Sequence, residues 1–158
     1  MASTLSNSSL TVSLTEKCIM DGSDVGKTRG YTVSTAIREF AHMFRNTPSN
    51  AFQPLLEFRK TETESGAQFD ADLVKYVRIS NLDDSARIGI VIVYGTAASN
   101  TEVGRFTVSV GPLENWTMGS PLAYCFEGEG VPYRDVLSLE VRGLDSTTPD
   151  IEVVVGSI

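Results

Sequence analysis

The chain of 158 residues has few of the side chains on which most metal and catalytic sites depend, namely one His and two Cys. A single histidine, His42, excludes a metal site with more than one His ligand, and Cys18 and Cys125 are too few for a cysteine-rich zinc module. Long apolar runs are missing as well: the longest has about five residues, whereas a helix needs about 18 to span a bilayer. We therefore expect no membrane partner.

Positive charge is also scarce, since the chain has 13 Lys and Arg but 20 Asp and Glu, which gives a net charge of −7. A surface of this sign repels the phosphates of nucleic acids and of anionic lipids, and the basic residues form no cluster. We expect no nucleic-acid partner. Residues 1–10 lack the apolar stretch of a secretory signal and the arginines of a transit peptide, which favours synthesis in a reducing cytosol with both thiols free.

What the chain does have is alternation of apolar and polar residues in short segments, separated by Gly, Pro, Asn and Asp. The expected strands cover residues 10–14, 31–33, 53–59, 73–81, 88–94, 104–110, 121–126, 136–141 and 150–155. Closely spaced strands without a long helical pattern in the second half are typical of an all-β, antiparallel β-sandwich or barrel. We assign residues 10–158 to a single β-sandwich domain and the Ser/Thr/Asn-rich residues 1–9 to a flexible N-terminal arm.

Residues 34–45 fit two periods. Ile37, Phe40, Ala41 and Phe44 are spaced as the apolar stripe of a helix, and slightly favour one. The same segment also alternates as a strand would. Pro48 ends the element in either case, because it disfavours helical geometry at the preceding residue.

Two glycine-rich strings resemble phosphate-binding loops but depart from them. In residues 22–28, Gly-Ser-Asp-Val-Gly-Lys-Thr, only three residues separate the glycines, and the position of the first P-loop Gly is Asp21. The residues that follow predict a strand, so we interpret this string as a hairpin turn. In residues 128–133 the third Gly of a dinucleotide fingerprint is replaced by Tyr133, which indicates a loop.

The acidic pairs and the single histidine, which could also form sites, are interpreted as residues without a binding or catalytic role. Acidic pairs such as Asp83 and Asp84 are expected to be solvated loop charges, because no run has the spacing of a twelve-residue calcium loop. No nucleophile motif accompanies His42, which we expect to be structural and partly exposed on its element. The sequence thus predicts no catalytic residue, no metal site and no cofactor, and a structural or interaction protein rather than an enzyme.

Three segments resemble small virion proteins of tailed bacteriophages, of the marine and cyanobacterial type. The first is residues 10–16, Leu-Thr-Val-Ser-Leu-Thr-Glu, followed by an Asp-Gly turn. The second is residues 69–84, which contain Lys-Tyr-Val-Arg-Ile-Ser-Asn-Leu-Asp-Asp, and the third is residues 110–116, where Gly and Pro are transposed relative to the family. The resemblance implies a jelly-roll-like β-sandwich, and in the family the segment equivalent to 40–46 is extended. On that ground we predict a strand there.

The resemblance also implies a function. We expect a non-enzymatic capsid decoration or cement protein that binds the major capsid protein shell as a homo-oligomer, a trimer or dimer, and that resides in the virion after synthesis in the host cytoplasm. Two alternatives stay open: a tail, neck or fibre-associated virion component, and a carbohydrate-binding sandwich using aromatics such as Trp116, Tyr124 or Tyr133. Candidate interface anchors are Leu5, Trp116 and Tyr133.

Overall fold

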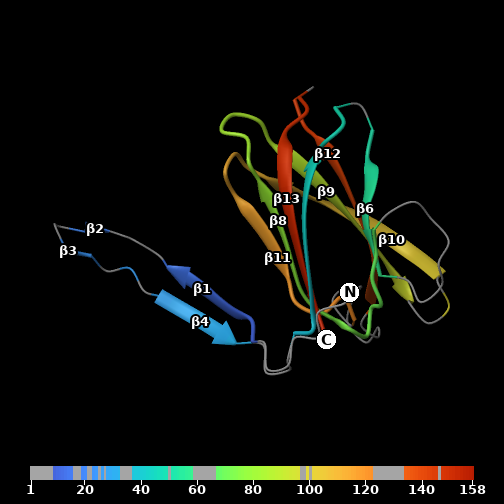
Figure 1. The fold of residues 1–158 in the computed structure, drawn as a ribbon. Coiled ribbons are helices and arrows are strands. Elements are labelled where there is room, and N and C mark those ends of the chain that lie inside the picture. Colours follow the sequence, from blue (N-terminus) through green and yellow to red (C-terminus); the bar gives the residue numbers. More distant parts are fainter. Residues whose placement is uncertain are drawn as a thin grey trace.

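The computed structural model describes residues 9–15, 19–20, 23–24, 26, 28–32, 37–49, 51–58, 67–96, 99, 101–122, 134–145 and 147–158. These residues form thirteen β-strands. Figure 1 shows two sheets packed face to face and a separate hairpin that projects from them. The fold is therefore an all-β sandwich, as the alternating pattern predicts.

The four-stranded sheet is antiparallel throughout. In spatial order it consists of β11 (Asn115–Met118), β8 (Val74–Asn81), β13 (Asp150–Ser157) and β5 (Glu39–Asn46). β5 and β11 are its two edge strands. The pairing between β13 and β5 is continuous over eight residues, from Asp150 opposite Asn46 to Ser157 opposite Glu39.

The five-stranded sheet is antiparallel apart from its last, two-residue strand. In spatial order it consists of β10 (Thr101–Val110), β9 (Ile88–Thr96), β12 (Asp135–Gly143), β6 (Gln53–Glu57) and β7 (Ala67–Gln68). β7 pairs parallel with β6. Register shifts, each the mark of a bulge or irregularity, interrupt the pairing of β9 with β10 and of β12 with both of its neighbours.

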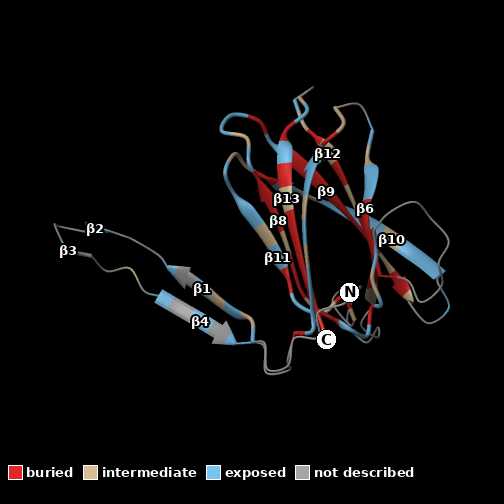
Figure 2. Ribbon diagram, in the orientation of Figure 1, coloured by how far each residue is buried: buried red, intermediate tan, exposed pale blue. Residues whose placement is uncertain are grey.

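The core fills the space between the two sheets. On β8, Val77 and Ile79 are fully buried, whereas Arg78 between them is only partly buried, as the two-residue period of a strand requires. On β12, fully buried Leu139 lies between Leu56 of β6 and Ile92 of β9. Figure 2 shows these buried residues concentrated on the central strands of both sheets.

The eight longer strands of the sandwich pair in a nested order. Along the chain, the first (β5) pairs with the last (β13), and the second (β6) pairs with the second last (β12). The third (β8) pairs with β11, and the two middle strands, β9 and β10, pair with each other. Strands that are consecutive in the sequence therefore fall in different sheets, except for β9 and β10.

The remaining strands form a long hairpin, which we call the ribbon and which runs from residue 11 to residue 32. β1 (Thr11–Thr15) pairs antiparallel with β4 (Thr28–Thr32), and β2 (Ile19–Met20) pairs with β3 (Ser23–Asp24) nearer the tip. The P-loop-like string thus lies in a hairpin and continues into a strand, not into the helix that phosphate binding would require. The string was predicted to be the hairpin turn itself, but its described residues lie along one arm of the hairpin, with Ser23 and Asp24 in β3 and Thr28 in β4.

Residues 39–46, which fit both periods, form strand β5, so the predicted strand is confirmed and the helix that the periodicity slightly favoured is wrong. Ala41 and Met43 pack toward the core, while Phe40 and Phe44 are exposed on the other face. Phe40 and Phe44 are four residues apart, a spacing that places them on one face of a strand as it would on one face of a helix. The first residues of the ambiguous segment, 34–36, lie outside the described residues.

Two further expectations need correction. The strand predicted at residues 121–126 is not seen where the structure describes it, because Pro121 and Leu122 lie in a bend and turn and the rest of the segment lies outside the described residues. Strand β11 was not expected at all, because its four residues alternate between polar and apolar but are too few to stand out as a strand. The predicted flexible arm, residues 1–9, is described only at residue 9.

Candidate interaction surface

The outer face of the four-stranded sheet carries a group of side chains that the core does not use. The strand register places these residues in three rows that run across the strands. The rows are Phe40, Gly156 and Tyr76; His42, Val154, Arg78 and Thr117; and Phe44, Glu152, Ser80 and Asn115. Because β5 and β13 are far apart in the sequence, this face exists only once the sheet has formed.

Glu152 is the centre of a polar cluster on this face. One carboxylate oxygen lies 2.7 Å from Nε2 of His42, and the other accepts a hydrogen bond of 2.5 Å from Nη2 of Arg78 and one of 3.3 Å from Oγ of Ser80. Burial by itself would raise the pKa of Glu152, but the hydrogen bond to His42 and the charges of Arg78 and His42 outweigh it, so the pKa lies below its usual range. The cluster therefore fixes β5, β13 and β8 to one another from the outside.

Two phenylalanines flank this cluster on β5. Phe40 is 54% exposed and Phe44 is 63% exposed, although both are large and apolar. The ring of Phe44 lies against that of His42, with centroids 4.9 Å apart and planes inclined by 48°. Exposed apolar side chains that stand together beside a charged network are typical of surfaces that bind another protein.

The same face also anchors the ribbon. Gly156 of β13 leaves room above the sheet, where a Cβ atom added to it would lie 3.6 Å from the side chains of both Leu10 and Ile37. Ile37 is buried, as is Tyr76 on the neighbouring strand. Leu10 precedes the ribbon and Ile37 follows it, so both ends of the hairpin are held at one place on the outer face.

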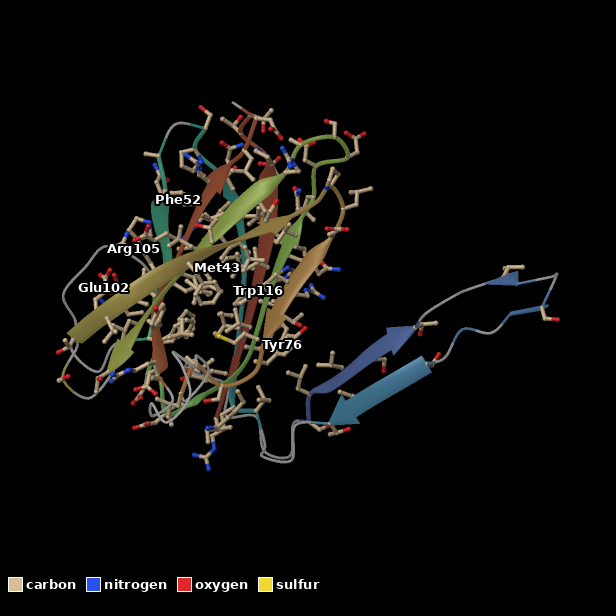
Figure 3. All side chains as sticks on the ribbon, turned by 180° about the vertical axis from the view of Figure 1, so that it is seen from behind. Met43, Phe52, Tyr76, Glu102, Arg105 and Trp116 are labelled. Carbon is tan, nitrogen blue, oxygen red and sulfur yellow. The ribbon has the colours of Figure 1, made fainter. Side chains whose placement is uncertain are left out.

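The outer face of the five-stranded sheet is different in character. Arg105 of β10 forms an ion pair of 2.9 Å with Glu102 and lies 3.8 Å from Glu140. Arg142 stacks on the ring of Phe52, with 4.6 Å between the guanidinium carbon and the ring centroid. Figure 3 labels Phe52, Glu102 and Arg105 on this side. Arg105 thus pairs with carboxylates and Arg142 with an aromatic ring, and among the residues described this face offers no exposed aromatic pair like that of β5.

Of the three predicted interface anchors, only Trp116 lies within the described residues. It is partly buried on β11, opposite Ile79, and packs against the core, and Figure 3 shows it between the two sheets with Met43. Leu5 and Tyr133 lie outside the described residues, as do Tyr124, Cys18 and Cys125, so their predicted roles stay predictions. His42 is 44% exposed on β5, with its Nε2 atom 2.7 Å from Glu152, and its structural role stays a prediction.

Phe40, Phe44 and Glu152 were not recognised as surface residues from the sequence. The spacing of Phe40 and Phe44 did signal an apolar stripe, but it was interpreted as the apolar face of a possible helix and not as an exposed surface. Among the described residues, no three His, Cys, Asp or Glu side chains gather where they could hold a metal ion. No helix in the described part of the chain is long and apolar enough to cross a membrane.

No known protein-family model matches the chain, and no curated protein is similar to it at a significant level.

Proposed function

We propose that the chain is a non-enzymatic structural protein of a tailed-phage virion, a decoration or cement protein that binds the shell of the major capsid protein and stabilises it. The observation that carries the proposal is the nested strand order, in which β5 pairs with β13, β6 with β12, β8 with β11 and β9 with β10. This order supports a jelly roll, an eight-stranded architecture common among capsid proteins.

The distribution of surface features supports a binding role rather than catalysis. A jelly roll by itself hosts many functions, so a function must be supported by a site. The side chains that stand out are Phe40 and Phe44, which suit contact with a protein, and His42, whose Nε2 is already engaged by Glu152. The net charge of −7 favours a protein partner over nucleic acid or an anionic membrane.

The family-like segment at residues 69–84 supports the virion assignment from the sequence. Its central part forms β8, which lies in the middle of the four-stranded sheet, and its end forms the loop that leads to β9 in the opposite sheet. In that loop Asn81 donates hydrogen bonds to the carbonyl oxygens of Ala86, at 2.7 Å, and Gly111, at 2.9 Å. The resemblance thus covers residues that build the sandwich.

Counting the chain in purified particles tests this function. By quantitative mass spectrometry, we expect about one copy per major capsid protein, or a simple fraction such as about one to three, as repeated docking on a symmetric shell requires. A handful of copies would instead favour the tail, neck or fibre alternative. Complete absence from particles would refute any virion role.

A further inference from the structure

The ribbon lacks the support that a two-stranded hairpin needs. β1 and β4 pair only with each other among the described strands, which leaves the outer edge of each strand open. Thr11, Ser13, Thr15, Thr28, Gly30 and Thr32 are exposed. Figures 1 and 3 show the ribbon directed away from its own sandwich. An isolated two-stranded hairpin is only marginally stable in water, so the ribbon requires a surface beyond those that its own sandwich gives it.

The edge strand β5 of the sandwich could accept the ribbon as an additional paired strand. Among the described residues, β5 pairs with β13 on one side only, and the hydrogen bonds from Arg38 to Ser157 and from Thr47 to Pro149 continue that same side. The edges of natural sheets are usually protected by Lys, Pro, a bulge or a covering segment. The charged residues of β5, Glu39 and Arg45, lie near its two ends, and between them it has no Lys, no Pro and no bulge, while Phe40 and Phe44 are exposed along it.

We infer that the ribbon of one copy of this chain pairs with the free edge of β5 in a second copy. The added strand would satisfy the open backbone groups of both elements, and the side chains of the ribbon would cover Phe40 and Phe44. A ribbon strand fits within the edge, because its five extended residues span about 17 Å, whereas the eight residues of β5 span about 26 Å.

Equal numbers of ribbons and free β5 edges favour a second copy of the chain over an unrelated protein as the partner. Each chain supplies one ribbon and one free β5 edge, so a closed ring or a reciprocal pair satisfies every one of them. Leu10 precedes the ribbon and Ile37 follows it. Both lie on the outer face that carries Phe40, beside the β5 strand to which the ribbon of another copy would pair. The inference does not depend on the virion assignment.

Two variants of the full chain test the inference. In the first, residues 11–32 are replaced by a short Gly/Ser linker, which removes the ribbon and keeps Leu10 and Ile37. In the second, Phe40→Lys and Phe44→Lys charge the β5 edge at two exposed positions that the core does not use. Leu82→Lys with Leu113→Lys is the matched control, because these residues are comparably exposed but lie in turns. Light scattering after size exclusion gives the mass of each.

We expect the unaltered chain and the control to have about two or three times the monomer mass of 17.1 kDa, and each test variant to be monomeric. An equimolar mixture of the two test variants should restore a one-to-one heterodimer, since one supplies the edge and the other the ribbon. An oligomer that survives removal of the ribbon would overturn the inference and favour pairing between two β5 edges. A monomeric unaltered chain would overturn it as well, whatever the copy number in particles.

Discussion

Replacing Leu139 with alanine is expected to lower the free energy of unfolding by about 3–5 kcal/mol, because it opens a cavity in the middle of the core. Leu139 is fully buried on β12, and Leu56 and Ile92 flank it on the two neighbouring strands. Since β12 is hydrogen-bonded on both sides, these neighbours cannot collapse into the space that the side chain leaves. The loss should therefore be near the upper end of the range for a Leu-to-Ala change.

Thermal unfolding measures this loss, which corresponds to a fall in Tm of about 10 °C for a chain of this size. Leu82→Ala is the matched control, because Leu82 is 43% exposed in the loop between β8 and β9. Its unfolding free energy should stay within about 0.5 kcal/mol of the unaltered chain. Equal Tm values for the two variants would show that Leu139 does not lie between the sheets.

Glu152→Gln is expected to cost about 1–2 kcal/mol near neutral pH, because it removes the negative charge that holds Arg78 and His42. The side chain of Glu152 is 20% exposed, so solvent screens the cluster only in part. Glutamine keeps the shape of the side chain, which limits the change to charge and hydrogen bonding. Glu102→Gln is the control, since its ion pair with Arg105 is far more exposed and should contribute little.

The cost should depend on pH in a defined direction. Because folding lowers the pKa of Glu152 from its ordinary value of 4.5, its stabilisation is complete above that value and is lost as the pH falls through the lowered pKa. Denaturant unfolding of both proteins at about pH 7 and about pH 3 should show a difference that is smaller in acid. A constant difference, or none at neutral pH, would mean that the carboxylate does not support the sheet.

The alternation of residues predicts most strands because each of them contributes one apolar face to the core. β8 is an example, with Val77 and Ile79 inside and Arg78 outside. β5 obeys the same rule less visibly, since its inward residues are Ala41 and Met43 while the larger rings face outward. Local periodicity therefore slightly favoured a helix, whereas pairing with β13 makes the segment a strand.

The candidate surface could not be predicted from the sequence, because its parts meet only through long-range pairing. His42 and Glu152 are 110 residues apart, and the sequence around either residue does not predict contact with the other. The alternation at residues 10–14 predicts a strand, but whether that strand joins the sandwich depends on its partner. That partner is β4, and the pair leaves the sandwich as the ribbon.

The most direct test of the proposed function adds the purified chain back to shells assembled from the major capsid protein alone. We predict that binding saturates at a fixed ratio per shell subunit and that the bound chain raises the temperature at which the shells rupture, as followed by light scattering. Stabilisation follows because any ligand that binds only the intact shell shifts its equilibrium by mass action. Shells that bind none of the chain, or that rupture at an unchanged temperature when saturated with it, would contradict the account.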